Sequence, residues 1–234
     1  MKIMLIGSSG KMGKEFCNVI QESKTDQIVA YVDTKNSPQN KNPDLPLFRD
    51  IPTKTSWSAN AAFDIIVDFS TKQGKEDIID CALLNKVPLA IFSTTCSGED
   101  IDYLNKASKH IPVLHCQNTS IGINAFLNIL PTLKEVFDSA DIVIEEEHAK
   151  TKIDSPSGTA KLITSKIKTL TKNDVEVHPL RVGNERGSHT LKLFLEDEVL
   201  TISHRANSRK IFATGAYKML KKLYYKKPGF YTYL

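Results

Sequence analysis

The stretch that decides the fold is KIMLIGSSGKMGKEFCNVI, residues 2–20. Its first six residues form a short apolar run that ends in glycine. Four apolar residues then recur at helical spacing: Met12, Phe16, Val19 and Ile20. The sequence therefore predicts a strand that passes through a tight turn into a helix.

The turn itself is Gly7-Ser8-Ser9-Gly10-Lys11-Met12-Gly13. It follows the spacing Gly-x-x-Gly-x-x-Gly, with Ser9 where the commoner dinucleotide-binding fingerprint has glycine. Glycines allow a close approach to the backbone, and the first N–H groups of a helix attract a pyrophosphate. Asp33 ends the next expected strand, where a carboxylate can accept hydrogen bonds from an adenosine ribose. We therefore expect a dinucleotide site; the alternative is an ordinary strand-to-helix turn with a surface aspartate.

Strands and helices alternate along the first half of the chain. Further β-branched and apolar runs lie at residues 28–32, 63–69, 87–92 and 111–114, and helical patterns at residues 72–85 and 99–109. This alternation is typical of crossover units that build a parallel sheet covered on both faces. The expected fold class is α/β, with a Rossmann-like dinucleotide-binding domain over residues 1–118.

After residue 118 the pattern changes. A helix is expected over residues 122–137, a strand over 141–147 and a helix over 157–170. Alternating apolar residues on both sides of a turn at 196–198 predict an antiparallel pair. Residues 206–225 form a final helical pattern. We expect a second, α+β domain over residues 119–205, with residues 206–234 returning to the first domain.

A second chemical signal lies in residues 147–159. An expected strand end carries His148, a short loop carries Lys152, and Ser157-Gly158-Thr159 opens a helix. One imidazole, one ammonium group and one helix N-terminus suit an anionic substrate that must receive a proton. Taken singly, His148 reads as a surface or structural histidine and Lys152 as a solvated lysine. Their cluster, together with a cofactor domain, favours catalysis.

Composition narrows the class of protein. The 234 residues are 41% hydrophobic and 25% charged, which is typical of a globular chain. No apolar run reaches 18 residues, so neither a membrane span nor a secretion signal is expected. Four widely spaced cysteines, Cys17, Cys81, Cys96 and Cys116, favour reduced thiols in the cytoplasm and no metal site.

The net charge of +4 is unevenly distributed. Residues 204–234 carry eight Lys or Arg and no acid. A basic terminal helix could contact nucleic acid, but scattered charges more often form the solvated face of a packed helix. We expect the second arrangement, on an apolar stripe of Phe212, Tyr217, Leu220 and Leu223.

Several motifs together resemble the 4-hydroxy-tetrahydrodipicolinate reductases, also called dihydrodipicolinate reductases, of bacterial lysine biosynthesis. The resemblance runs in order along nearly the whole chain, and its most specific string is Lys-x-Asp-x-Pro-Ser-Gly-Thr at residues 152–159. The other matching segments are residues 7–13, 67–71, 118–124, 181–183, 204–209 and 212–216.

The resemblance implies reduction of a cyclic imine dicarboxylate, with loss of water and hydride transfer from NADH or NADPH. It implies that His148 is the catalytic acid/base and Lys152 a proton donor, and that Lys152, Ser157, Gly158 and Thr159 bind substrate. It also implies a homotetramer formed through the sheet of the second domain. The implied cofactor-binding residues are Gly7, Ser8, Ser9, Gly10, Lys11, Met12, Asp33, Ser93, Thr94, Thr95, Cys116, Gln117, Asn118 and Thr119.

Four positions in three segments depart from the family pattern. The second of two consecutive family histidines falls on Ala149, the usual Gly-Thr-Thr-Gly becomes Ser93-Thr94-Thr95-Cys96, and Thr119 replaces a phenylalanine. These changes alter the surroundings of the nicotinamide and remove one substrate contact, but they keep the expected acid and anion site.

Two other functions fit the same pattern. One is a different two-domain NAD(P)-dependent reductase or amino-acid dehydrogenase, because a fold does not fix its substrate. The other is a non-catalytic, redox-sensing dinucleotide-binding regulator whose basic tail contacts DNA. For the cofactor, we expect NADH to serve at least as well as NADPH, because the charge of Asp33 would repel a 2′-phosphate. Lys11 and Lys35 could offset that repulsion.

Overall fold

The computed structural model describes residues 1–33, 47–48, 62–71, 75–93 and 95–233. Contacts divide the chain into two compact units. The first unit is residues 1–119 with 212–234, and the second is residues 120–211. The expected division into a dinucleotide-binding domain, 1–118 with 206–234, and a substrate-binding and oligomerisation domain, 119–205, stays a prediction.

The first unit holds a seven-stranded sheet in which all neighbouring strands are parallel. The strand order is β11-β6-β5-β4-β1-β2-β3. Read from β3 to β6, this is the order of a Rossmann fold, so the α/β prediction is confirmed. The strands are β1 (Lys2–Ile6), β2 (Gln27–Val32), β3 (Leu47–Phe48), β4 (Ile65–Asp68), β5 (Leu89–Ile91), β6 (Pro112–His115) and β11 (Gly229–Tyr231).

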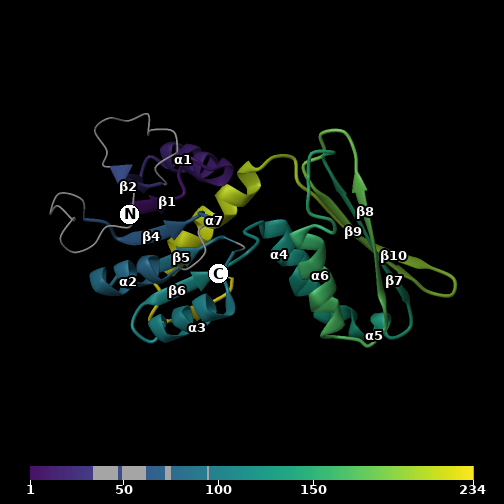
Figure 1. Cartoon of the computed structure of the whole chain (residues 1–234). Coiled ribbons are helices and arrows are strands. Elements are labelled where there is room, and N and C mark those ends of the chain that lie inside the picture. The colour runs from purple at the N-terminus through teal and green to yellow at the C-terminus, as the bar shows by residue number, and fades with distance from the viewer. Residues whose placement is uncertain (34–46, 49–61, 72–74, 94, 234) are drawn as a thin grey trace. The chain divides into compact units, whose positions relative to one another are not determined.

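Helices cover both faces of this sheet (Figure 1). On one face α1 (Lys11–Ser23) and α7 (Lys210–Leu223) pack against β1 and β4 through residues such as Phe16 and Leu220. On the other face lie α2 (Glu76–Asn85) and α3 (Gly98–Ala107), with Ile79 and Leu104 in the core. Helix α2 was expected to begin at residue 72; residues 72–74 lie outside the described part of the chain.

Helix α7 is part of the core of the first unit. It buries Ala213, Ala216, Met219, Leu220 and Leu223, while Lys218, Lys221 and Lys222 are exposed. Of the expected apolar stripe, Leu220 and Leu223 are buried, and Phe212 and Tyr217 are half-buried. The lysines therefore form the solvated face of a packed helix.

The second unit holds a mixed four-stranded sheet in the order β10-β9-β7-β8. Its strands are β7 (Asp141–His148), β8 (Val175–Arg181), β9 (Ser188–Phe194) and β10 (Val199–Arg205). The expected antiparallel pair is confirmed as β9 and β10, whereas β8, parallel to β7, was not expected. The helices are α4 (Ile121–Ile129), a 3₁₀ turn η2 (Leu130–Leu133), α5 (Lys134–Phe137) and α6 (Gly158–Lys168).

The single helix expected over residues 122–137 is wrong in detail. Pro131 lies in the first turn of η2, at the point where the α-helical pattern ends. Proline has no N–H to donate within a helix and its ring clashes with the preceding turn. The segment therefore forms two short α-helices joined by a 3₁₀ turn.

One face of the second sheet is apolar over most of its length. Ile142, Ile144, Leu191 and Leu193 are buried there and form a core with residues of α4 and α6. Further along β7 the same alternation brings Glu146 and His148 to this face, and β9 brings His189. The face thus changes from apolar to polar at one end of the sheet.

Candidate active site

The glycine turn of the first unit lies between β1 and α1. Gly7 has φ +76°, and a Cβ there would lie 2.8 Å from the backbone nitrogen of Ser70, so only glycine fits. Gly10 occupies the N-cap of α1, where it has no side chain to accept a hydrogen bond from the first N–H groups of the helix. Those groups suit the oxygens of a pyrophosphate.

Asp33 follows β2 and binds the same turn. Its Oδ2 accepts hydrogen bonds from the hydroxyl of Ser8 and the N–H of Ser9 (2.9 Å), and its Oδ1 accepts one from the Ser9 hydroxyl (2.8 Å). Asp33 is 8% exposed. The aspartate therefore shapes the turn, which the sequence did not indicate, and it lies at the end of the sheet where a ribose contact was expected.

The other expected cofactor residues lie at the carboxyl ends of neighbouring strands. Ser93 follows β5, and Cys116 follows β6 with its thiol donating to the backbone oxygen of Asn118 (3.2 Å). The hydroxyl of Thr119 donates to the backbone oxygen of Phe212 at the start of the packed part of α7 (2.7 Å). Carboxyl ends of parallel strands form one edge of a sheet, where ligands of this fold bind. Of the expected residues, Thr94 lies outside the described residues.

In the second unit, β7 ends at His148. Its Nδ1 contacts Oε2 of Glu146, a fully buried carboxylate two residues earlier. Its Nε2 lies beside Gly187, where a Cβ would be 3.0 Å away. Burial lowers the pKa of His148 below its usual value, although the charge of Glu146 opposes this shift. The imidazole is therefore mainly neutral near pH 7.

Residues after His148 lead to the N-terminus of α6. Nζ of Lys152 donates a hydrogen bond to Oδ1 of Asp154 (2.7 Å), and the lysine side chain is 28% exposed. Ser157 caps the helix, its hydroxyl accepting from the N–H of Ala160 (3.2 Å). His148, Lys152 and the Ser157–Thr159 helix start thus lie in one connection, the loop from the end of β7 to the start of α6. Within it, Asp154 pairs with the lysine that was expected to contact substrate. Ala149 is half-buried and donates its N–H to the backbone oxygen of Glu185 (2.8 Å).

Two buried side chains next to this connection were not among the expected site residues. Glu146 accepts hydrogen bonds at Oε1 from the N–H of Ser157 (3.1 Å) and from Arg181 (3.0 Å). His189 places Nε2 3.1 Å from the hydroxyl of Ser157, and burial, with the nearby charge of His148, lowers its pKa to about 4. Glu146 lies on β7 and His189 on the neighbouring β9, and the two are brought together only by the register of these strands.

Glu146, His148 and His189 also form a set of ligand atoms within 4.8 Å of one another. Two imidazoles and a carboxylate are ligands that zinc accepts. Arg181, however, already binds this carboxylate, and His148 contacts it directly. We therefore interpret the set as a network of ion pairs and hydrogen bonds centred on Glu146. The expectation of no metal stays a prediction.

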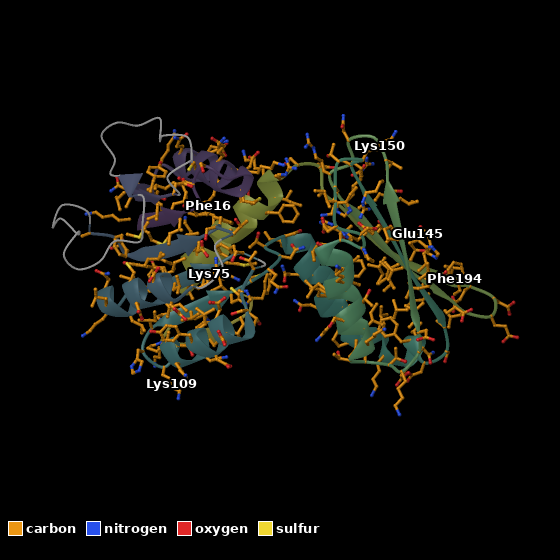
Figure 2. All side chains as sticks on the ribbon, viewed as in Figure 1. Phe16, Lys75, Lys109, Glu145, Lys150 and Phe194 are labelled. Atoms are coloured by element: carbon orange, nitrogen blue, oxygen red, sulfur yellow. The ribbon has the colours of Figure 1, made fainter. Side chains whose placement is uncertain are left out.

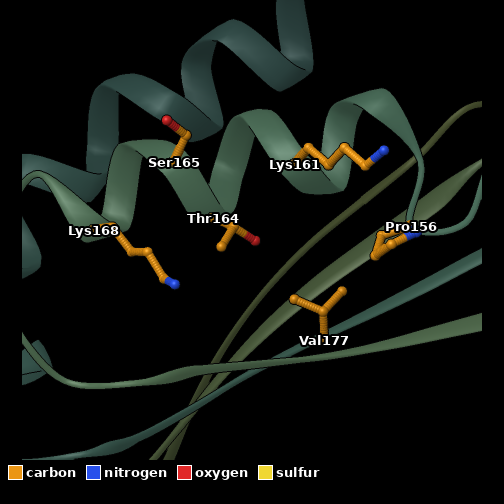
Figure 3. A pocket seen from close by; sticks show the side chains of 6 residues that line it. All are labelled: Pro156, Lys161, Thr164, Ser165, Lys168 and Val177. Carbon is orange, nitrogen blue, oxygen red and sulfur yellow. The ribbon is translucent and has the colours of Figure 1, made fainter.

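Two hollows of about 340 Å³ lie close to this connection. The first, between α6 and β8, is lined mainly by side chains of α6, with Val177 from the strand and Pro156 from the loop (Figure 3). The second is polar and lies along the loop after Gly183, lined by Asn184, Glu185, Arg186, Arg205, Ala206 and Asn207. His148 and Lys152 line neither.

Comparison with known proteins gives the family of the chain. The family model described as "Dihydrodipicolinate reductase, N-terminus" matches residues 1–119, and "Dihydrodipicolinate reductase, C-terminus" matches residues 122–233. The chain belongs to the dihydrodipicolinate reductase family. Both the glycine turn and the loop from His148 to Thr159 fall within the matched parts.

Individual members of the dihydrodipicolinate reductase family match this chain over nearly its full length. A 4-hydroxy-tetrahydrodipicolinate reductase of Caldanaerobacter subterraneus subsp. tengcongensis is 32% identical over 99% of this chain and 96% of its own. One from Thermosipho africanus is 33% identical over 100% of this chain and 96% of its own. A solved structure, dipicolinate-bound dihydrodipicolinate reductase from Paenisporosarcina sp. TG-14, has a TM-score of 0.83 at 18% identity and covers 99% of this chain and 97% of that one.

Proposed function

We propose that the chain reduces 4-hydroxy-tetrahydrodipicolinate to tetrahydrodipicolinate, with loss of water, in lysine biosynthesis. Family membership supports this reaction, and one structural observation carries it. Strand β7 delivers His148 into a connection that contains Lys152 and ends at the capped N-terminus of α6. A proton-exchanging group, a cation and a helix N-terminus therefore lie in one segment of the second unit.

The first unit fits the reduced dinucleotide that this reaction needs. Gly7 and the uncapped N–H groups of α1 would hold the pyrophosphate, and Asp33 the adenosine ribose. Ser93, Thr95 and residues 116–119 would lie beside the nicotinamide. When bound, the reduced nicotinamide supplies the hydride.

The second unit would bind and protonate the substrate. A substrate carboxylate suits the N–H groups at the start of α6 and the ammonium group of Lys152, in competition with Asp154. Hydride addition to a conjugated imine leaves an electron pair on the ring system that must take up a proton. His148 would exchange that proton through Nε2, an effect that typically contributes about 10²–10⁴-fold to the rate.

For the cofactor, we propose that NADH serves at least as well as NADPH. Asp33 places a carboxylate at the carboxyl end of β2, where a 2′-phosphate would meet a like charge. Lys11, at the start of α1, could lessen that repulsion, but a flexible ammonium is a poorer phosphate clamp than a guanidinium. Thr34 and Lys35 lie outside the described residues.

We also propose a homotetramer assembled through the uncovered face of the second sheet. That face exposes Phe194 (41%) and Val199 (50%), which are paired neighbours in the β9–β10 ladder. Glu145 and Lys192 form an ion pair on it, and Glu145 and Phe194 are labelled there in Figure 2. Light scattering after size-exclusion chromatography tests the assembly: a mass of four chains supports it, and a monomer contradicts it.

Among the described helices, none is sufficiently long and apolar to span a membrane. The cytoplasmic location and the absence of nucleic-acid partners stay predictions.

A steady-state assay with enzymatically generated substrate tests the function. We expect substrate-dependent oxidation of both NADH and NADPH, at a rate proportional to protein concentration. His148→Gln should lose most of this activity while it still binds NADH. Oxidation with another keto or imino acid but not with this substrate would favour a different reductase, and dinucleotide binding without turnover would favour a regulator.

A further inference from the structure

Glu146 occupies a central position in the second unit. It is fully buried on β7, two residues before His148, so both side chains lie on the same face of the strand. Its Oε2 contacts Nδ1 of His148, while its Oε1 accepts hydrogen bonds from Ser157 N–H (3.1 Å) and from Arg181 Nη2 (3.0 Å). Each oxygen therefore has a distinct set of partners.

The partners of Oε1 determine what Oε2 can do. Burial opposes ionisation of Glu146, but the hydrogen bonds from Ser157 and Arg181 outweigh it, and the pKa of Glu146 lies below its usual value. The side chain is therefore a carboxylate, which can only accept hydrogen bonds. An imidazole nitrogen that faces such an oxygen must carry the proton.

We propose that Glu146 is a positioning residue for His148: it holds the proton on Nδ1 and thereby makes Nε2 the nitrogen that exchanges a proton with substrate. The proposal rests on the proposed function for the identity of the reaction but not for the close contact between Nδ1 of His148 and Oε2 of Glu146. Nε2 lies beside Gly187, where a Cβ would come within 3.0 Å of it, so glycine lets the backbone pass this close to the ring.

Arg181 completes the arrangement. The β7–β8 register places Arg181 opposite His148, and its Nη2 binds both Oε1 of Glu146 and the backbone oxygen of Asp154 (2.6 Å). One guanidinium thus connects the carboxylate behind the imidazole to the loop that carries Lys152. A fixed imidazole and a fixed loop are what a preorganised proton-transfer site requires.

The effect of a Glu146→Gln substitution follows from these contacts. Ser157 N–H and Arg181 both need an acceptor, so the amide oxygen of glutamine must take the place of Oε1. Its NH₂ group then faces Nδ1 of His148, which must become the unprotonated nitrogen. The neutral imidazole changes to the Nε2–H tautomer, and the imidazolium form loses its charge partner.

Kinetics with three variants test the role. We expect Glu146→Gln to lower kcat by about 10²-fold, the range of a lost acid–base contribution, with little change in KM or NADH affinity. Glu146→Asp, which keeps the charge, should recover part of the loss. Glu135→Gln, which changes an exposed glutamate on α5 away from this cluster and from the proposed assembly face, should behave as wild type.

The pH profile separates positioning from a structural role. The charged or titratable groups that face His148 are Glu146 on β7, Lys152 in the loop, Arg181 on β8 and His189 on β9. Loss of the carboxylate removes the one anion in this set, so the imidazolium becomes harder to form. The activity of Glu146→Gln should therefore decline with rising pH at a lower pH than that of wild type.

A spectroscopic measurement keeps the proposal testable if the proposed reaction is wrong or the variant misfolds. In ¹⁵N NMR of wild-type imidazoles, assigned with His148→Gln, we expect the Nδ1–H tautomer at His148, also after dialysis against EDTA. An Nε2–H tautomer, a change on metal removal, or a Glu146→Gln variant with wild-type kcat and pH profile would overturn the proposal. Lack of activity in wild type with the expected tautomer would instead refute only the proposed function.

Discussion

Lys75 and Asp68 form an ion pair, Nζ to Oδ2 2.8 Å, in which neither side chain has any exposed surface. Lys75 lies in the interior of the first unit, just before α2, and Asp68 ends β4 (Figure 2). Nζ also donates to the backbone oxygen of Ser70 (3.3 Å), and Oδ1 of Asp68 accepts from Ser70 N–H (2.7 Å). The pair therefore fixes the backbone at Ser70, against which Gly7 of the glycine turn packs.

Removal of one partner should destabilise the protein strongly. Lys75→Met leaves Asp68 buried and unpaired, which should lower the free energy of unfolding by about 3–5 kcal/mol. The double variant Asp68→Asn with Lys75→Met should recover part of that loss, and the exposed Lys109→Met should stay within about 0.5 kcal/mol of wild type. Urea unfolding measures all three; a Lys75→Met variant as stable as wild type contradicts the assignment.

Asp33 should determine the choice of cofactor. We expect wild type to use NADH at least as well as NADPH, and Asp33→Ala to shift the ratio of kcat/KM toward NADPH because the repelling charge is gone. Ser8→Ala, which removes one hydrogen bond to Asp33 but keeps its charge, should retain the wild-type ratio. A wild-type preference for NADPH of tenfold or more, about 1.4 kcal/mol, would show that nearby lysines dominate.

Lys152 should matter for turnover and not for folding. We expect Lys152→Ala to lower kcat/KM by about 10²-fold, since it removes a cation next to the α6 N-terminus and a possible proton donor. Lys150→Ala is the matched control, because Lys150 is an exposed lysine in the same loop. Thermal melting and NADH titration should give wild-type values for both variants. Equal kinetic losses in the two variants would indicate a general effect of loop charge.

His189 should make the stability depend on pH. Its pKa is about 4 when folded, so between about pH 6.5 and 4 the unfolded chain binds a proton that the folded chain does not. Stability should therefore fall as the pH falls through this range, by about 3 kcal/mol from this residue. His189→Gln should flatten the slope, whereas the half-exposed His178→Gln should keep it. An unchanged slope in His189→Gln would contradict the burial argument.

The sequence predicted most of the first sheet because its strands are buried on both faces and read as apolar, β-branched runs. Strand β8 escaped prediction, since Glu176 and His178 interrupt its valines and Pro179 lies within it. Strand β11 has three residues, and its pairing with β6 depends on contacts across half the chain. The local sequence therefore indicates neither β8 nor β11 as a strand.

The candidate site was predictable only in part, for the same reason. His148, Lys152 and the Ser157–Thr159 helix start lie in one short stretch, so spacing and motif indicate them. Glu146 and Arg181 lie 35 residues apart and meet through strand register, which no local pattern reveals. Lys75 stands among polar residues and reads as solvent-exposed; its burial depends on the position of Asp68 in space.

A single-turnover reaction with NADH deuterated at both C4 positions tests most directly whether this chain transfers a hydride to the ring of its substrate. The same reaction tests whether His148 exchanges the proton. We expect wild type to form tetrahydrodipicolinate heavier by one mass unit, and His148→Gln to form the same product at least about 10²-fold more slowly. Oxidised cofactor without deuterium in the product, or a His148→Gln variant as fast as wild type, would contradict this mechanism.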